Sequence, residues 1–269
     1  MRRRSLLVSG LAGAAACAGA RPQRPGTTGG ALRVGADAAL IDSGLARALQ
    51  RAFSGDTGID VQMVRGAALP LLDALAAGEF DAGLTNAPEA EAKLDRQGLV
   101  HDRRSIASGA FIIVGPGRRA SRSAAVAAPA RDARAFLSWL NQTAIAQPDA
   151  LVFLSANDGS GAHVAEQSAW RSAGIAPQAP WYRVAAPDSG LIAQARAKSA
   201  FALVEQGAWN SLGGAPLTIL VQGDRQLVEE VHTMRSFRSP HPAGKIFVAW
   251  IAGAHGRAVV AAQRGYRAP

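Results

Sequence analysis

The most informative segment of the chain reads Phe153-Leu154-Ser155-Ala156-Asn157-Asp158-Gly159-Ser160-Gly161-Ala162-His163. Its apolar start predicts a strand, its glycines a turn, and its end a helix over about 160–172. Glycines on both sides of Ser160 let the backbone approach a ligand, and the first turn of a helix offers unpaired N–H donors. The segment therefore predicts an anion site at the helix start, around Ser160 and Gly161. Alternatively, Ser160 only caps its own helix.

Strand and helix patterns alternate on both sides of this segment. Toward the N-terminus, strands are expected at about 31–35, 59–63, 81–85 and 105–114, with helices between them that end near Gly78 and Gly98. This β-α-β order predicts a mainly parallel sheet with helices on both faces, an α/β fold. Residues 115–129 are rich in Gly, Pro, Ser, Arg and Ala, and we expect a crossing into a second lobe there.

The remaining elements are predicted from the same patterns. Strands are expected at 151–155, 181–184, 201–205 and 217–221, and helices at 132–140, 160–172, 191–198, 225–231 and 243–262. The two lobes would then comprise 31–115 with 217–269, and 116–216.

Composition narrows the functional classes. The 269 residues carry 29 basic and 20 acidic side chains, a formal charge of +9, with 48% hydrophobic residues, which is ordinary for a globular chain. Only three of the basic residues are lysines, and the arginines are scattered among few aromatic residues, so a nucleic-acid partner is not expected. A single cysteine excludes a disulfide framework, and the five histidines lack metal-ligand spacing, so no metal is expected.

The first residues have the layout of an export signal. Three arginines at 2–4 precede an apolar run at 6–16, and small residues surround Cys17. This pattern predicts a secretory signal peptide at 1–20, followed by a flexible tether at 21–30. The general and twin-arginine export routes both remain open. Cys17 is a candidate lipidation site, so the only membrane contact we expect is a lipid anchor. No apolar run reaches the about 20 residues of a spanning helix.

The chain resembles the extracellular tungstate-binding proteins, solute-binding components of ABC importers. Their signature F-V-S-R-G-D-D-S-G-T-H corresponds to 153–163. Further matches follow in order: Asp42-Ser43-Gly44, the stretches 78–81 and 87–91, FIIVGP at 111–116, residues 181–182 and 201–209, and the tail FVAWIAGAHG at 247–256. The resemblance implies a two-lobe, type II periplasmic-binding-protein-like fold that holds a small oxyanion in its cleft, without a cofactor and without catalysis. It also implies a membrane permease and an ATPase as partners.

The departures from the family lie where ligand contacts are expected. Alanines or leucine replace most hydroxyls of the first loop at 36 and 38–40, and Ala156 stands where the family has an arginine. An arginine is the side chain best suited to a dianion, so its loss weakens the case for tungstate itself. The ligand residues that the resemblance leaves are Ser43, Asp158, Ser160 and Gly161, with Ser108 in the stretch before FIIVGP.

Three alternatives stay open at this stage. Arg65, before Gly66, is a candidate replacement charge or a solvated surface residue. The chain is a transport component or, alternatively, a sensor or interaction subunit that has lost tungstate binding. Ser160 and His163 lie three residues apart, but their context is not the G-x-S-x-G turn of serine hydrolases, which argues against an enzyme.

Overall fold

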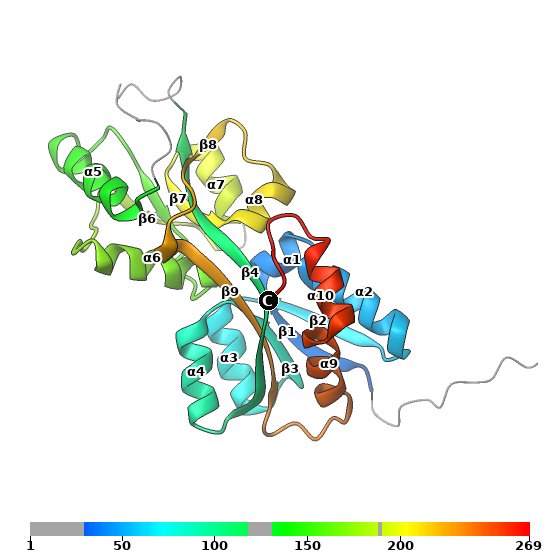
Figure 1. Cartoon of the computed structure of the whole chain (residues 1–269). Helices are drawn as coiled ribbons and strands as arrows, with labels where there is room; N and C mark the ends of the chain where they lie inside the picture. The colour runs from blue at the N-terminus through cyan, green and yellow to red at the C-terminus, as the bar shows by residue number, and fades with distance from the viewer. Residues whose placement is uncertain (1–29, 118–130, 188–189) are drawn as a thin grey trace, which may run out of the picture.

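Two long antiparallel strands, β4 (Val100–Pro116) and β9 (Val228–Ser236), form the axis of the molecule (Figure 1). The computed structural model describes residues 30–117, 131–187 and 190–269. Up to Ala110, β4 pairs with β9, and from Phe111 it pairs with β7. Because β4 changes partners within one continuous strand, it carries the sheet from one lobe into the other.

The first lobe contains both ends of the described chain. Its sheet has the order β2-β1-β3-β9-β4. Its other elements are β1 (Leu32–Asp37), α1 (Ala38–Asp42), α2 (Leu45–Thr57), β2 (Val61–Gly66), α3 (Ala68–Ala77), β3 (Ala82–Thr85), α4 (Pro88–Arg96), α9 (Ala243–Ala252) and α10 (Ala254–Ala261). One apolar cluster joins α2, α9 and α10 to the sheet, and a second joins α3 to it. Helices thus cover both faces, as expected for an α/β lobe.

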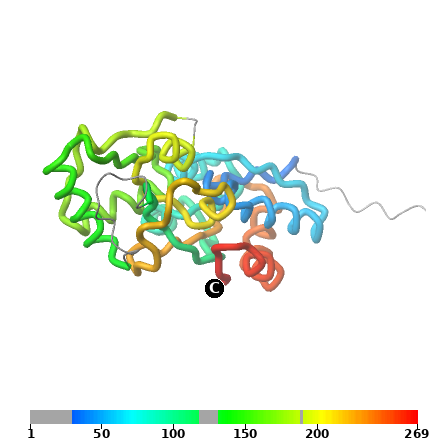
Figure 2. Tube along the Cα trace, turned by 90° about the horizontal axis from the view of Figure 1, so that it is seen from above, coloured from blue at the N-terminus to red at the C-terminus, as the bar shows by residue number. Residues whose placement is uncertain are grey.

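The second lobe is built from the middle of the chain. Its elements are α5 (Ala133–Ala146), β5 (Phe153–Ser155), α6 (Gly161–Ser172), β6 (Tyr182–Val184), α7 (Leu191–Lys198), β7 (Ala202–Glu205), α8 (Gln206–Leu212), β8 (Leu217–Val221) and a 3-10 turn (Arg225–Leu227). Its core consists of two apolar clusters, one around Phe153 and one around Val204, and the first includes the aromatic contact between Phe153 and Trp170. Figure 2 shows this green-to-yellow part at one end of an elongated molecule and the blue, cyan and red parts at the other.

The α/β fold class is confirmed, and the pairing of the strands is mixed. β1 pairs in parallel with β2 and β3, and β5 with β6, as the β-α-β order predicts. β4 and β9, in contrast, pair antiparallel with their neighbours. The expectation of mainly parallel sheets therefore holds for the β-α-β units and not for the two strands that connect the lobes.

The prediction of a helix at 225–231 is wrong. A 3-10 turn ends at Leu227 and β9 begins at Val228. The polar residues Glu229, His232 and Thr233 obscured the strand pattern, yet all three are buried in the sheet. Two of them have tertiary partners: Asn86 donates to Glu229, and the His232 ring contacts Glu91.

The division of the chain into lobes stays a prediction. Leu220, Val221 and Leu227 pack in the second lobe's apolar cluster, and β8 pairs with β4 at 113–116. These contacts favour a boundary between Leu227 and Val228 rather than before residue 217. We propose that 217–227 belong to the second lobe.

The predictions for the N-terminus concern residues outside the part of the chain that the structure describes. They are the signal peptide at 1–20, the possible lipidation of Cys17, and the tether at 21–30, of which only residue 30 is described. Most of the expected crossing at 115–129 also lies outside the described residues. Over the ranges that the structure describes, no helix combines the length and apolar character required to cross a membrane.

Candidate functional site

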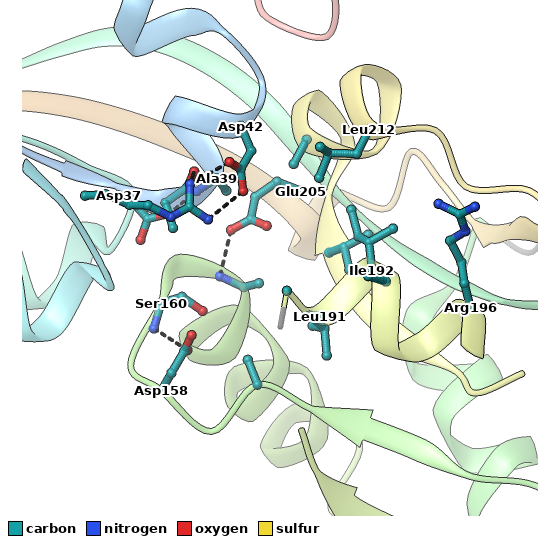
Figure 3. A pocket seen from close by; sticks show the side chains of 18 residues that line it. Asp37, Ala39, Asp42, Asp158, Ser160, Leu191, Ile192, Arg196, Glu205 and Leu212 are labelled. Atoms are coloured by element: carbon teal, nitrogen blue, oxygen red, sulfur yellow. Dashed lines mark hydrogen bonds and ion pairs between the residues drawn. The ribbon is translucent and has the colours of Figure 1, made fainter. Parts of the chain in front are cut away.

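A pocket of about 450 Å³ lies between the two lobes (Figure 3). Its volume falls within the range typical of small-molecule sites. The first lobe contributes Asp37, Ala38, Ala39, Asp42 and Arg65, while the second contributes Ala156, Asp158, Ser160, Ala162, residues 190–193, Arg196, Val204, Glu205, Ala208 and Leu212. The pocket meets the carboxyl end of β1, where ligands of open α/β sheets commonly bind.

Asp37 ends β1 and faces the pocket with a fully buried side chain. Its Oδ1 accepts a hydrogen bond from Ala39 N at 2.9 Å and so caps α1, while Oδ2 has no hydrogen-bond partner among the described residues. Burial raises the pKa of Asp37 to about 6, and the charge of Asp158 adds to the rise. The amides of Ala39, Gly161 and Ala68 oppose it.

The N-terminus of α6 faces oxygens of the protein itself. The amide of Gly161 acts on the Asp37 carboxylate, and Ala162 N donates to Glu205 Oε1 at 3.1 Å. The amide of His163 donates to Ser160 Oγ at 3.3 Å. These are the N–H groups that a helix start normally leaves free for an anion. In this arrangement, side-chain oxygens of the chain already occupy that position.

Two further buried carboxyl groups, those of Glu205 and Glu229, lie close enough to Asp37 for its charge to affect them. Burial raises the pKa of Glu205 well above its usual range, and the charges of Asp37 and Glu229 act in the same direction. Burial also raises the pKa of Glu229 to about 8. Asn86 Nδ2 donates to Glu229 Oε1 at 2.9 Å, whereas Glu229 Oε2 has no partner among the described residues. The three acids come from β1, β7 and β9, so the contact between the lobes assembles them.

Arg65 lies at the pocket with its charge already paired. Both of its terminal nitrogens donate to Asp42, with the Nη2–Oδ2 distance at 2.8 Å, and Nη1 also donates to Ala38 O. Arg65 therefore lines the pocket, as the sequence suggested, but as half of an ion pair. Arg196 lies at the opposite end from Asp37, beyond Ile192 (Figure 3).

The remaining wall is apolar. Leu191, Ile192 and Ala193 come from the start of α7, and Val204, Ala208 and Leu212 from β7 and α8. Leu191 and Ile192 lie on the side of the pocket away from Asp37 (Figure 3). The pocket therefore has one acidic side and one aliphatic side.

Ser43 and Ser108 lie away from this pocket. Ser43 follows α1, donates to Leu40 O at 3.0 Å and accepts from the Tyr266 hydroxyl at 3.2 Å. Ser108 pairs through its backbone N–H and C=O with Arg267 and lines another depression. Both contacts depend on the returning C-terminal tail, which local sequence patterns do not place.

Gly161 and His163 hold the turn in place. A Cβ atom at Gly161 would overlap the side chain of Asn86, so the glycine lets α6 approach the first lobe. Gly159 N donates to His163 Nδ1 at 3.0 Å. Among the described residues, no group of three or more His, Cys, Asp or Glu side chains is placed to hold a metal ion.

Sequence reasoning missed Asp37 and Glu205 as pocket residues. Asp37 is the one charged residue in the alanine-rich first loop, between Ala36 and Ala38. Glu205 lies in the stretch 201–209, which carries part of the resemblance. Both acids are visible in the sequence, but only the fold shows that they are buried beside the same pocket.

Comparisons with solved structures place the fold. The tungstate ABC transporter from Geobacter sulfurreducens is similar, with 26% identity and a TM-score of 0.72 over 86% of this chain and 97% of that one. The tungstate-binding protein TupA from Desulfovibrio alaskensis has 23% identity and a TM-score of 0.67, covering 90% of this chain and 99% of that one. The periplasmic molybdate-binding protein of Azotobacter vinelandii has 16% identity and a TM-score of 0.60, covering 88% and 99%.

No family model and no curated protein matches the chain. The structural neighbours nevertheless show that it has a two-lobe, type II periplasmic-binding-protein-like fold. They also support a relationship to the periplasmic oxyanion-binding proteins.

Proposed function

We propose that this chain is the extracytoplasmic solute-binding component of an ABC importer, which holds a small solute between its lobes and delivers it to a permease and its ATPase. The observation that carries the proposal is the 450 Å³ pocket lined from both lobes. A solute touching both lobes stabilises their closed arrangement, which is the physical basis of hinge closure. The structural neighbours from tungstate and molybdate systems support the same class of function. The chain performs no chemistry and needs no cofactor.

The oxyanion implied by the resemblance would bind at Asp158, Ser160 and Gly161. It would meet the Asp37 and Glu205 carboxyl groups there, and Ala156 offers no charge in return. A hydrogen bond to a charged group contributes about 1.5–3 kcal/mol, and about 1.4 kcal/mol corresponds to a tenfold change in affinity. We therefore expect tungstate to bind far more weakly than to relatives with the full motif.

Isothermal titration calorimetry with tungstate, molybdate and phosphate tests this expectation. We expect weak or absent heats of binding, because carboxyl groups of the chain already occupy the start of α6. Nanomolar tungstate affinity would contradict the expectation and would require Arg65 to leave Asp42 for the anion.

A ligand-responsive sensor is the second candidate, favoured by the replacement of the family's oxyanion contacts at Ala156 and in the first loop at 36 and 38–40. Crosslinking on intact cells separates the two roles. Recovery of a permease and an ATPase with the chain supports transport, whereas recovery of a signalling protein without them supports sensing.

A further inference from the structure

The charges of the pocket do not balance. Four carboxyl groups line it, from Asp37, Asp42, Asp158 and Glu205, against two guanidinium groups, from Arg65 and Arg196. The Arg65 charge is matched by Asp42, with two hydrogen bonds between them. Arg196 lies at the far end of the pocket (Figure 3). Arg65 is therefore the cation that faces Asp37, and because it is paired with Asp42, the acidic side keeps more carboxyl groups than guanidinium groups, in a chain whose overall charge is +9.

Asp37 is the group that most needs a partner. Its side chain is 0% exposed, and its Oδ2 has no hydrogen-bond partner in the part of the chain that the structure describes. A buried carboxyl oxygen that has lost water and has no hydrogen-bond partner is costly, and the nearby amides of Gly161 and Ala68 offset only part of that cost. Glu205 is 5% exposed and lies beside the same space. A donor group placed between these two side chains would satisfy both.

We propose that the pocket binds a small organic cation, a primary or secondary ammonium with an apolar body. Its N–H groups would point to Asp37 and Glu205, and its apolar part would lie against Leu191, Ile192 and Leu212. The inference rests on the solute-binding function proposed above and names the class of the solute.

Other ligand classes fit these walls less well. The first amides of α6 already interact with the side-chain oxygens of Asp37, Glu205 and Ser160, so they are not free to bind an oxyanion. For a metal ion, the described residues contain no group of three or more His, Cys, Asp or Glu side chains placed to bind it. A quaternary ammonium has no N–H to donate, and no aromatic side chain is among the described lining residues to contact its charge. An ammonium with N–H donors uses both sides of the pocket.

Binding of a cation should release protons. The charged and titratable groups that face Asp37 are Arg65, Asp158, Glu205, Glu229 and Tyr266. Burial raises the pKa of Asp37 to about 6 and that of Glu229 to about 8, and it also raises the pKa of Glu205, with the charges of neighbouring carboxylates adding to each rise. A bound positive charge favours their ionised forms. The affinity for a cation should therefore rise with pH from about 5 to about 8, and that for an anion should fall.

Calorimetry with three probes of nearly equal size tests the charge class directly. We would titrate the full mature chain with benzylamine, benzyl alcohol and benzoate, with tungstate as the oxyanion. We expect benzylamine to bind about tenfold or more tightly than the alcohol, since one charge-assisted hydrogen bond accounts for that difference. Repeating the titration in buffers of different ionisation enthalpy should reveal net proton release.

Variants locate the site. Asp37→Asn and Glu205→Gln should each remove most of the preference for benzylamine over benzyl alcohol, while Asp60→Asn, an exposed acid outside the pocket, should leave it unchanged. Thermal unfolding verifies that each variant is folded. Because Asp37 also caps α1, the pH profile and the proton release of the unmodified chain provide a test that needs no substitution.

Each outcome is decisive. The inference is overturned if benzylamine binds no better than benzyl alcohol or gives no heat at millimolar concentration. It is also overturned if benzylamine binds without proton release and with a flat pH profile. Tungstate or benzoate binding in place of benzylamine overturns the cation class while solute binding stands. If none of the four probes gives a heat of binding, the proposal of a cationic solute is overturned. Crosslinking to the permease then tests the proposed function separately.

Discussion

Replacing Glu229 by Gln should remove a large part of the pH dependence of stability. Glu229 is fully buried, and burial raises its pKa from 4.5 to about 8. Between these two values the unfolded chain has lost the proton that the folded protein still holds. Stability from this group is therefore complete below about pH 4.5, declines as the pH rises toward 8, and is absent above it. Gln resembles the protonated acid and cannot ionise.

The magnitude follows from the size of the shift. Each pH unit inside the window costs the native protein about 1.4 kcal/mol relative to the variant, or roughly 4 kcal/mol over roughly three units. The amide leaves one N–H without a partner at the position of Oε2, which costs the variant about 1–3 kcal/mol at every pH. We therefore expect Glu229→Gln to be somewhat less stable than the native chain near pH 5 and more stable near pH 8.

Urea denaturation followed by the fluorescence of the five tryptophans measures this crossing. Glu230→Gln is the matched control, because the neighbouring side chain is exposed and should leave the pH profile unchanged. Parallel profiles for Glu229→Gln and the native chain would refute the reasoning. They would mean that Glu229 is already ionised in the folded protein.

Three further outcomes are expected. Ser160→Ala should lower the free energy of unfolding by about 1 kcal/mol in urea denaturation, because the His163 amide loses its cap; unchanged stability would contradict that role. Gly161→Ala should destabilise the chain by about 1–3 kcal/mol through overlap with Asn86, whereas Gly55→Ala, with open space at its Cβ, should be neutral or stabilising; equal melting temperatures would contradict the contact. Mass spectrometry of the exported protein should find residues before Cys17 or Ala20 absent, and Cys17→Ser should abolish membrane association only if that residue is lipidated; an intact Met1 would contradict export by a cleaved signal.

Local patterns predicted most elements of the fold. The spacing of leucines at 69, 72 and 75 indicated a helix ending at Gly78, and the structure has α3 with Gly78 as its left-handed cap. The helix expected at 191–198 and the strand at 217–221 coincide with α7 and β8. These features depend on neighbours three or four residues apart, or on alternation within one strand, so the sequence alone contains the information.

The site was predicted only in part. Asp158, Ser160 and Arg65 line the pocket, whereas Ser43 and Ser108 contact the C-terminal tail instead. The strand–turn–helix segment was readable because its residues are consecutive. The tail that carries Tyr266 and Arg267 returns from the far end of the chain, and no local pattern indicates which serine it will cover.

The sequence by itself determined the α/β alternation, the glycine-rich turn at the start of α6 and the resemblance to an oxyanion-binding family. Only the tertiary structure decided the charge of the pocket. Asp37, Glu205 and Glu229 lie on three strands far apart in the chain, and they meet because β4 and β9 join the lobes and Gly161 lets α6 approach Asn86. Burial and mutual repulsion then shift their pKa values. Such shifts depend on distances through space, whereas propensity and periodicity act along the chain.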